Sequence, residues 1–504
     1  MKKHLASASL LLIFFIAYMT LYRHVVIFHE QHHLFRFSLD YIRETAHQQG
    51  FTAPCAAFLA QFGYYPWLAA LIWSALLTGV YCMTRAFLRR VAGFNDSLQL
   101  SAIIPCWTFF STVNIDGSLN QFVIVVLSAL ALYCISLVLP ARKRVISIPW
   151  KPLPYLAPAI IAAIFGAFYL YSFHPVTVTL NGTERTFNRQ EVKVQKANEE
   201  LMVKAAQAVR RKDWDEVLKL SDRQAETGVK NHLMLYFRAM ALYHRGELLD
   251  RIFEQPQSHG PNSLFFPWKA DKNRAEYGGY IYEQLGALNS AIHWEFEALV
   301  GWGETAYHLI NLSRYYIETG KPKQAEKFIH PLKQTLFYRG EARRLEEQKK
   351  NGHVPGLRDA LANVKQNPAD FDPVRFDNVL NIGADCKYIL LNDPDNEMAR
   401  QYMLLIFLLA NNIGVFYDNL CQFYQPDEPL PRIFEEALCL VRLNYGSDRL
   451  AADGFKISPE VDAAYRAFLT EKQKGRFTNF TPEQRNSLWY YLSFVSPSGN
   501  QLNF

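Results

Sequence analysis

An uncharged apolar run from Leu153 to Phe173 restricts the fold of this 504-residue chain more than any other feature. As a helix, a run of about 20 apolar residues is long enough to cross the roughly 30 Å hydrocarbon layer of a bilayer. Before this run the sequence contains further apolar stretches, and after it apolar residues recur at helical spacing between charges, Asn and Gly. The sequence therefore predicts an all-α chain with a membrane domain (1–173), a linker (174–197) and a water-soluble helical tail.

The charges divide at the same point. Residues 1–173 carry 12 Lys and Arg against 5 Asp and Glu, whereas the remainder carries 41 against 42. The positive excess thus lies in the membrane half, where it can orient helices. The nearly neutral tail lacks the basic face that nucleic-acid binding needs, which argues against nucleic acid as a partner. The seven cysteines include no CxxC pair and are interpreted as small buried hydrophobic residues.

Five stretches are predicted to cross the membrane: 5–22, 67–84, 98–113, 122–139 and 153–173. The first is followed by no small-x-small cleavage site, so it is interpreted as an uncleaved span. Arginine clusters mark the cytoplasmic ends of membrane helices. With Lys2 and Lys3 inside the cell, five crossings place the clusters at 85–90 and 142–144 inside and the tail outside. We therefore predict a multi-pass protein of the bacterial inner membrane with a cytoplasmic N-terminus and an extracytoplasmic C-terminal domain.

The predicted outer loop, 23–65, mixes apolar residues with charges, which indicates one or two helices lying in the membrane interface. It contains His29-Glu30-Gln31-His32-His33, a match to H-E-x-x-H, in which two histidines hold zinc and the glutamate acts as base. A third ligand at a familiar spacing is absent. We favour a His-rich interfacial face and keep His29 and His33 only as candidate metal ligands. No catalytic residue and no cofactor is predicted.

The same loop carries a resemblance. An acidic residue and a Gln follow the first predicted span, and a Phe-Leu-x-Gln-Phe segment precedes the second; the matching positions are Glu30, Gln31, Phe35, Phe58, Leu59, Gln61 and Phe62. In these features the chain resembles an uncharacterised family of bacterial multi-pass membrane proteins with a helical-repeat tail. The turn before the segment departs from the family pattern, since it is Gln49-Gly50-Phe51 rather than Pro-Gly-Gly. The resemblance implies no activity, and it makes the histidines incidental because the acidic-Gln pair is the shared feature.

The tail repeats itself every 34 residues. Two sets of positions show this period. The first set is Leu201, Ala205, Ala208 and Lys212, followed 34 residues later by Leu235, Ala239, Leu242 and Gly246. The second set is Gly279, Tyr282, Gly286, Ala291 and Ala298, followed 34 residues later by Ser313, Tyr316, Gly320, Ala325 and Leu332. The pattern resembles tetratricopeptide (TPR) repeats, with Gly ending the first helix of each pair. The first pair is less regular, since Arg251 occupies a slot for a small residue, and 257–267 is interpreted as a loop insertion. We predict a TPR-like α-solenoid over 198–350 and further helices over 351–504.

Arrays of helix pairs usually present a curved face to a protein or peptide. Trp302 and Tyr315 lie off the core positions of the repeat and are candidates for such a face. The leading hypothesis is a non-enzymatic membrane protein whose outer tail acts as a protein-interaction scaffold in the cell envelope. The predicted partners are the lipid bilayer and a protein or peptide on the tail. The alternatives are a transferase of the lipid-linked-sugar type using Glu30, and a zinc hydrolase using His29, Glu30 and His33.

Overall fold

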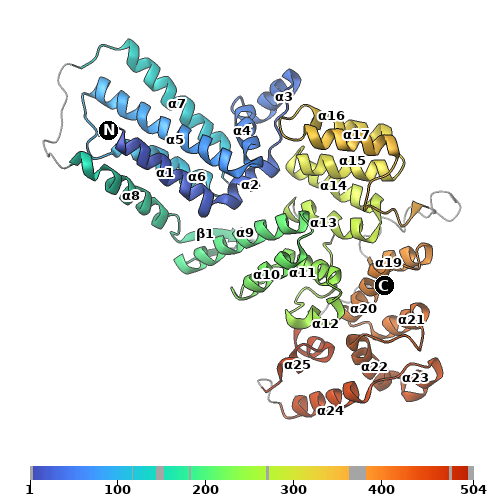
Figure 1. Ribbon diagram of the computed structural model, residues 1–504. Coiled ribbons are helices and arrows are strands. Elements are labelled where there is room, and N and C mark those ends of the chain that lie inside the picture. Colours follow the sequence, from blue (N-terminus) through green and yellow to red (C-terminus); the bar gives the residue numbers. More distant parts are fainter. Residues whose placement is uncertain are drawn as a thin grey trace. The chain divides into compact units, whose positions relative to one another are not determined.

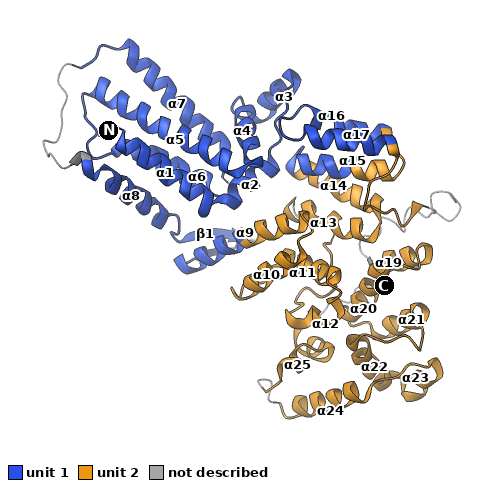
Figure 2. Ribbon diagram, viewed as in Figure 1, with its two compact units in different colours: residues 1–200, 302–313, 323–350 blue, residues 201–301, 314–322, 351–504 orange. Residues whose placement is uncertain are grey.

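The structure is a computed structural model, and it is overwhelmingly helical (Figure 1). The predicted all-α class is confirmed, with one two-stranded sheet among the described residues. The chain folds into two compact units (Figure 2): residues 1–200, 302–313 and 323–350 form the first, and residues 201–301, 314–322 and 351–504 the second. The described residues are 4–115, 117–142, 153–180, 183–267, 272–362, 382–475 and 479–497.

Apolar helices build the core of the first unit: α1 (Leu5–Thr20), α5 (Pro66–Phe87), α6 (Ile103–Thr112), α7 (Leu119–Val138) and α8 (Leu153–Tyr171). All of them contribute to one hydrophobic cluster. Aromatic rings fill its centre, where Phe14 stacks on Phe109 with centroids 5.2 Å apart and Tyr18 meets the edge of Trp73 at 5.5 Å. Such pairs contribute beyond the apolar area that they bury, so the short helices α6 and α8 pack as members of the same bundle.

The five stretches predicted as spans all contain helices, but only some of these helices have the length and composition to cross a membrane. Two helices, Pro66–Ala92 and Leu119–Val138, are long and apolar enough to cross a membrane alone, and α1 with α2 (Arg23–His32) makes a third candidate, bent by 74°. The predicted spans 98–113 and 153–173 are shorter apolar helices, Leu100–Thr112 and Tyr155–Tyr171. Proline has no backbone N–H to donate within a helix, and Pro105 is the third residue of α6, where this donor is not needed.

The predicted outer loop is helical. It holds α2, α3 (Leu39–Gln49), α4 (Ala53–Ala60) and a 3-10 turn, Gln61–Tyr64, where one or two helices were expected. The turn lies close against α2, because a Cβ added to Gly63 would stand 2.7 Å from the Glu30 Cβ and 2.8 Å from the Val26 carbonyl oxygen. The Phe-Leu-x-Gln-Phe segment therefore ends directly beside the acidic-Gln pair.

The segment predicted as a linker contains an antiparallel hairpin of β1 (Val176–Leu180) and β2 (Thr183–Phe187), with Val176 opposite Phe187. The first unit also includes residues 323–350, from the region predicted as repeats. These residues form most of α16 (Pro322–Lys333) and α17 (Arg339–Asn351). Ion pairs join the two helices, with Lys333 Nζ 2.5 Å from Glu346 Oε1.

Helix pairs continue through the rest of the repeat region: α9 (Arg189–Arg210), α10 (Trp214–Ala225), α11 (His232–His244), α12 (Leu248–Arg251), α13 (Lys272–Leu285), α14 (Leu288–Trp302) and α15 (Ala306–Glu318). Their boundaries follow the period of the sequence. Corresponding boundaries lie 34 residues apart in four pairs of helices. The last residues of α9 and α11 have this spacing, and so do the first residues of α10 and α12, of α13 and α15, and of α14 and α16. Gly246, Gly286 and Gly320 follow the first helix of successive pairs at φ of 71°, 79° and 69°, a conformation that favours glycine.

The irregular part of the repeat lies where the sequence placed it. Helix α12 ends at Arg251, the residue in the slot for a small side chain, and a 3-10 turn follows. The predicted insertion 257–267 contains turns and a 3-10 helix, Gly260–Ser263. A long charged side chain cannot sit where two helices cross closely, so the second helix of this pair stays short.

Helices α13 and α14 approach closely at a glycine. A Cβ added to Gly278 would lie 2.3 Å from the nearest ring atom of Trp294, which is itself 2 % exposed. A Cβ added to neighbouring Gly279 would also be crowded, though less so, because its nearest atom is the Trp294 Cβ at 3.2 Å. The indole thus packs flat against bare backbone, and this fit needs glycine at position 278.

Gly278→Ala is therefore expected to lower the stability of the protein by about 1–3 kcal/mol, because the indole must leave its position. The matched control is Gly340→Ala in α17, where an added Cβ meets nothing within 4 Å. There alanine should be neutral or stabilising by up to about 1 kcal/mol. Thermal unfolding of the purified full-length protein measures both, and equal midpoints for the two variants would contradict the close packing.

The remaining helices of the second unit are α19 (Ile382–Asn392), α20 (Glu397–Leu409), α21 (Ile413–Phe423), α22 (Arg432–Tyr445), α23 (Ser447–Asp453), α24 (Pro459–Gln473), α25 (Pro482–Arg485) and α26 (Leu488–Tyr490). The predicted starts at Ser458 and Thr481 are confirmed: each hydroxyl accepts a backbone N–H of the first turn, with Pro at the first helical position. The predicted helix from Asp370 begins outside the described residues.

Candidate functional site

Glu30, the acidic residue of the H-E-x-x-H match and of the acidic-Gln pair, is buried in the first unit. Its carboxylate accepts a hydrogen bond from the Tyr338 hydroxyl, which comes from the connection between α16 and α17. Tyr338 stands 308 positions away in the sequence. Glu30 thus helps to attach a late segment of the chain to the loop after α1.

Aromatic rings extend this attachment. Phe337 stacks on Tyr64 with ring centroids 5.2 Å apart and meets the rings of Phe62 and Tyr65 edge-on. The Phe37 N–H donates to the Gln334 carbonyl oxygen at 2.8 Å. The aromatic rings in and beside the 3-10 turn, at the end of the Phe-Leu-x-Gln-Phe segment, therefore pack against the connection between α16 and α17.

The candidate metal ligands His29 and His33 are engaged with the backbone. The His29 Nε2–H donates to the Thr112 carbonyl oxygen at 3.1 Å, and the His33 Nδ1–H donates to the His29 carbonyl oxygen at 2.7 Å. Burial and the neighbouring His33 lower the pKa of His29 to about 3, so this imidazole is neutral. Among the residues that the structure describes, no cluster of three or more His, Cys, Asp and Glu side chains could hold a metal ion.

A cavity of about 490 Å³ opens beside these histidines and lies entirely within the first unit. Its walls come from α2, α3, α4, the start of α7 and the residues after α14. The side chains that matter for its chemistry are Phe28, His29, Arg36, Glu44, Asn120 and Trp302. Glu30 is not among the lining residues, so the acid of the transferase hypothesis and the cavity are separate features.

The charges at the cavity are partly balanced. Arg36 Nη2 lies 3.2 Å from Glu304 Oε2, and its guanidinium stands over the Tyr41 ring, 4.9 Å from the centroid. Glu44 accepts a hydrogen bond from Gln48 at 3.1 Å. With His29 neutral, Arg36 faces the two carboxylates of Glu44 and Glu304, which disfavours a strongly anionic ligand.

The two residues proposed for a binding face, Trp302 and Tyr315, lie in different environments. Trp302 lines the cavity, where its ring lies 4.2 Å from that of His32 and 6.0 Å from that of Phe28. Tyr315 is fully buried and donates to Glu283 at 2.6 Å, so its placement on a binding face was wrong. Sequence reasoning missed Arg36 and Asn120, because nothing local connects residues so far apart in the chain.

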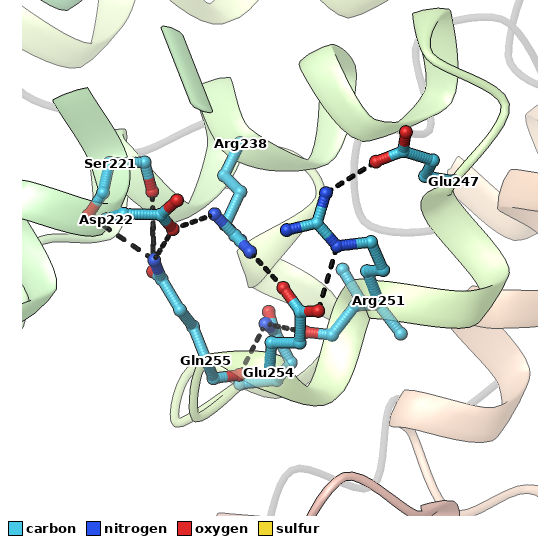
Figure 3. Close-up of polar contacts among 9 residues, drawn as sticks. Ser221, Asp222, Arg238, Glu247, Arg251, Glu254 and Gln255 are labelled. Atoms are coloured by element: carbon cyan, nitrogen blue, oxygen red, sulfur yellow. Dashed lines mark hydrogen bonds and ion pairs between the residues drawn. The ribbon is translucent and has the colours of Figure 1, made fainter. Parts of the chain in front are cut away.

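The second unit contains a network of ion pairs around one buried arginine, Arg238 (Figure 3). Arg238 lies on α11 with its side chain 2 % exposed, and it reaches Asp222 and Glu254 at 2.6 Å each. Arg251 pairs with Glu254 and Glu247 beside it. These contacts join α10, α11 and the turn after α12, and they give the Arg251 guanidinium two acidic partners.

Similarity to a protein family extends over most of the chain. The model described as "Family of unknown function (DUF6057)" matches residues 1–174 and 153–495. The chain belongs to this family. Membership agrees with the resemblance to an uncharacterised family and covers both the apolar helices and the repeat region of the DUF6057 chain. No curated protein and no solved structure is similar enough to the DUF6057 chain to count as a match.

Proposed function

We propose that this DUF6057 chain is a multi-pass protein of the bacterial inner membrane, and that its TPR-like helix pairs bind another protein on the outer side. The observation that carries the proposal is the 34-residue spacing of the helix boundaries from α9 to α16. Helix pairs stacked at this period form extended surfaces that natural proteins use for protein and peptide recognition. No catalytic group and no cofactor enters the proposal.

The surface of α7 supports the membrane location. This helix carries no charged residue, and only 22 % of its most apolar 18-residue window is buried within the protein. Its exposed large hydrophobic side chains are all aliphatic: Ile124, Leu127, Leu130, Leu132, Ile135, Leu137 and Val138. A soluble domain rarely exposes so continuous an apolar face, whereas a lipid-facing helix requires one. Because α1, α6 and α8 share the core with α5 and α7, we propose that all five helices lie in the bilayer.

The orientation can be tested with a native cysteine. Cys421 in α21 is an exposed free thiol. If the second unit is extracytoplasmic, a membrane-impermeant maleimide added to intact spheroplasts will modify it, and Cys421→Ser will remove that label. Modification of Cys421 only after lysis would place the unit inside the cell and overturn the proposal.

The partner can be tested by photo-crosslinking. Val300 on α14 is 85 % exposed, and Phe296 lies one turn before it on the same helix face. A photoreactive amino acid at position 300 should give one dominant protein adduct in living cells, and Phe296→Ala with Val300→Asp should abolish copurification of that protein. The comparison site is Leu443 on α22, also exposed. Adducts that are diffuse, or identical from positions 300 and 443, would contradict a specific binding face.

A further inference from the structure

A second cavity of the first unit, about 350 Å³ in volume, lies where three of the apolar helices end. Its walls come from the residues just after α1, α6 and α8, from the start of α2 and from one face of α9. The first turns of α9 lie beside the end of α8 (Figure 1), where the Lys196 ammonium donates to the Ser172 carbonyl oxygen at 2.9 Å. The cavity is therefore placed between the apolar bundle and the charged helix that follows it.

The α9 wall of this cavity carries charges of both signs. Lys193 and Lys196 stand over the Phe173 ring, with their ammonium nitrogens 5.6 Å and 5.2 Å from its centroid. Glu199 and Glu200 also line the cavity, one helical turn beyond Lys196 on the same helix. The cationic and the anionic parts of the wall are thus separated along α9, with the cations nearer to the end of α8.

The lysine end of the wall has capacity for a further acceptor. An ammonium group has three donors, and the Ser172 carbonyl oxygen takes one of those of Lys196. Burial lowers the pKa of Lys196, although the neighbouring Glu199 acts in the opposite direction. The surrounding charges therefore do not make up for the hydration that this ammonium has lost. A ligand that brings negative charge to the lysines would stabilise it.

The opposite wall is apolar and aromatic. Tyr22 follows α1, and Tyr169 lies in the last turn of α8. Tyr22 meets the edge of the buried Phe109 ring with centroids 5.6 Å apart, so it links the cavity to the core of the bundle. Leu21 and Val25 add aliphatic surface. Tyrosines are enriched at the boundary between the hydrocarbon layer and water, which is where the ends of membrane helices lie.

Together the two walls restrict the ligand. A simple anion would attract the two lysines but would be repelled by the two glutamates, and a simple cation would meet the reverse. A neutral glycolipid would use none of these charges. Water can hydrate the charges but leaves the apolar wall uncovered. A phospholipid with an amine in its headgroup carries a phosphate and an ammonium a short distance apart, and its acyl chains continue into the apolar layer.

We propose that this cavity binds the headgroup of an amine-bearing phospholipid of the phosphatidylethanolamine class, with the phosphate at the two lysines and the ammonium at the two glutamates. The proposal rests on the membrane location proposed above, because the ligand is a lipid of the surrounding bilayer. It does not depend on the protein-binding role of the helix pairs.

The test titrates the purified full-length protein in nonionic detergent with three phospholipids that have identical acyl chains, and native mass spectrometry measures the binding of the first lipid. Phosphatidylethanolamine carries both groups, phosphatidylglycerol carries the phosphate without the amine, and phosphatidylcholine carries a trimethylated amine that cannot donate a hydrogen bond. We expect phosphatidylethanolamine to bind about tenfold more tightly than phosphatidylglycerol, the effect of about one hydrogen bond to a charged group. It should also bind more tightly than phosphatidylcholine. Equal binding of the three lipids, or tighter binding of phosphatidylglycerol, would overturn the proposal.

Variants of the α9 wall test the two ends of the site separately. Glu199→Gln with Glu200→Gln removes the charges that hold the ammonium, so phosphatidylglycerol should then bind at least as tightly as phosphatidylethanolamine. This comparison is made between lipids within one variant, so a loss of stability does not imitate it. Lys193→Gln with Lys196→Gln should weaken the binding of phosphatidylethanolamine about tenfold.

Arg189→Gln is the matched control, since Arg189 is an exposed cation on the same helix that does not line the cavity. It should leave lipid binding unchanged. The proposal is wrong if the glutamine variant at 199 and 200 keeps the wild-type preference, or if Arg189→Gln weakens binding as much as the double lysine variant.

Two further measurements separate the possible failures. Glycerophosphoethanolamine, which has the headgroup without acyl chains, should compete only weakly, and an affinity equal to that of the lipid would exclude a lipid as the specific ligand. Alkaline carbonate removes peripheral proteins from cell membranes but leaves spanning proteins in place. Release of the wild-type protein by carbonate would overturn the membrane location and the lipid site together. Retention of the protein, combined with equal binding of the three lipids, would overturn the lipid site alone.

Discussion

Replacing both acidic partners of Arg238, as Asp222→Asn with Glu254→Gln, is expected to destabilise the second unit by about 3–5 kcal/mol. The two amides keep the shapes of the acids but remove their charges. Arg238 is 1 % exposed, so its guanidinium would remain buried with no opposite charge at either end. The acids are themselves partly exposed, with 54 % of the Asp222 and 33 % of the Glu254 side chain open to solvent. The arginine therefore carries most of the desolvation cost.

The same reasoning predicts an asymmetry that provides the control. Arg238→Met removes the buried charge, leaves both acids free to be hydrated, and should cost much less than the double amide variant. Asp418→Asn breaks an exposed pair with Arg449 and should change stability by less than about 1 kcal/mol. Hydrogen exchange of peptides from α10 to α12 in the full-length protein measures all three. If Arg238→Met proved as damaging as the double variant, packing of the arginine stem rather than its charge would hold the helices together.

The helical period was predictable from the sequence because it is a local property. Gly286 and Gly320 end a first helix, and Ala291 and Ala325 begin the crossing of a second. The residue types at these positions are set by contacts within one pair of helices. A fixed spacing of such residues in the sequence therefore predicts helices that start and end at the same spacing. Arg251 was correctly identified as a departure, although its partners Glu247 and Glu254 explain it only in three dimensions.

Hydropathy predicted the apolar helices but not their lengths. A window average does not detect that Leu100–Ala102 is a 3-10 turn or that the regular helix starts only at Ile103, two residues before Pro105. The stretch 98–113 is therefore apolar over the predicted range but helical in the regular sense only from Ile103 to Thr112. Span number is thus a weaker prediction than the presence of an apolar bundle.

The candidate site was least predictable, because its residues meet only after folding. Arg36, Asn120 and Trp302 line one cavity although they come from three distant parts of the chain. The H-E-x-x-H match lies in a loop that lines the cavity, but it was singled out as a possible zinc site and not for the contacts that its residues make. Its glutamate bonds Tyr338 and its first histidine bonds the Thr112 backbone, so a motif defined by spacing gave no information about these partners.

Acidification from pH 7 to pH 5 is expected to destabilise the region around the start of α11 by about 2 kcal/mol. His232 is 8 % exposed, and its ring donates to the Asn262 carbonyl oxygen. Burial, together with the neighbouring His259 and Arg274, lowers the pKa of His232 from 6.5 to about 4. Between these two values the unfolded chain binds the proton more tightly than the folded one does. The stability contribution is therefore complete above about pH 6.5 and is lost as the pH falls toward about 4.

His232→Gln isolates this group, because an amide can still donate to the Asn262 carbonyl but cannot titrate. Exchange of peptides covering 232–266, corrected for the intrinsic pH dependence of amide exchange, should show the loss of protection in the wild-type protein and a much flatter profile in the variant. His259 stacks on His232 with ring centroids 4.4 Å apart, and burial also lowers its pKa, so a small slope should remain until His259 is replaced as well. An unchanged slope in His232→Gln would show that another group titrates, and the buried contact with Asn262 would then have no part in the acid response.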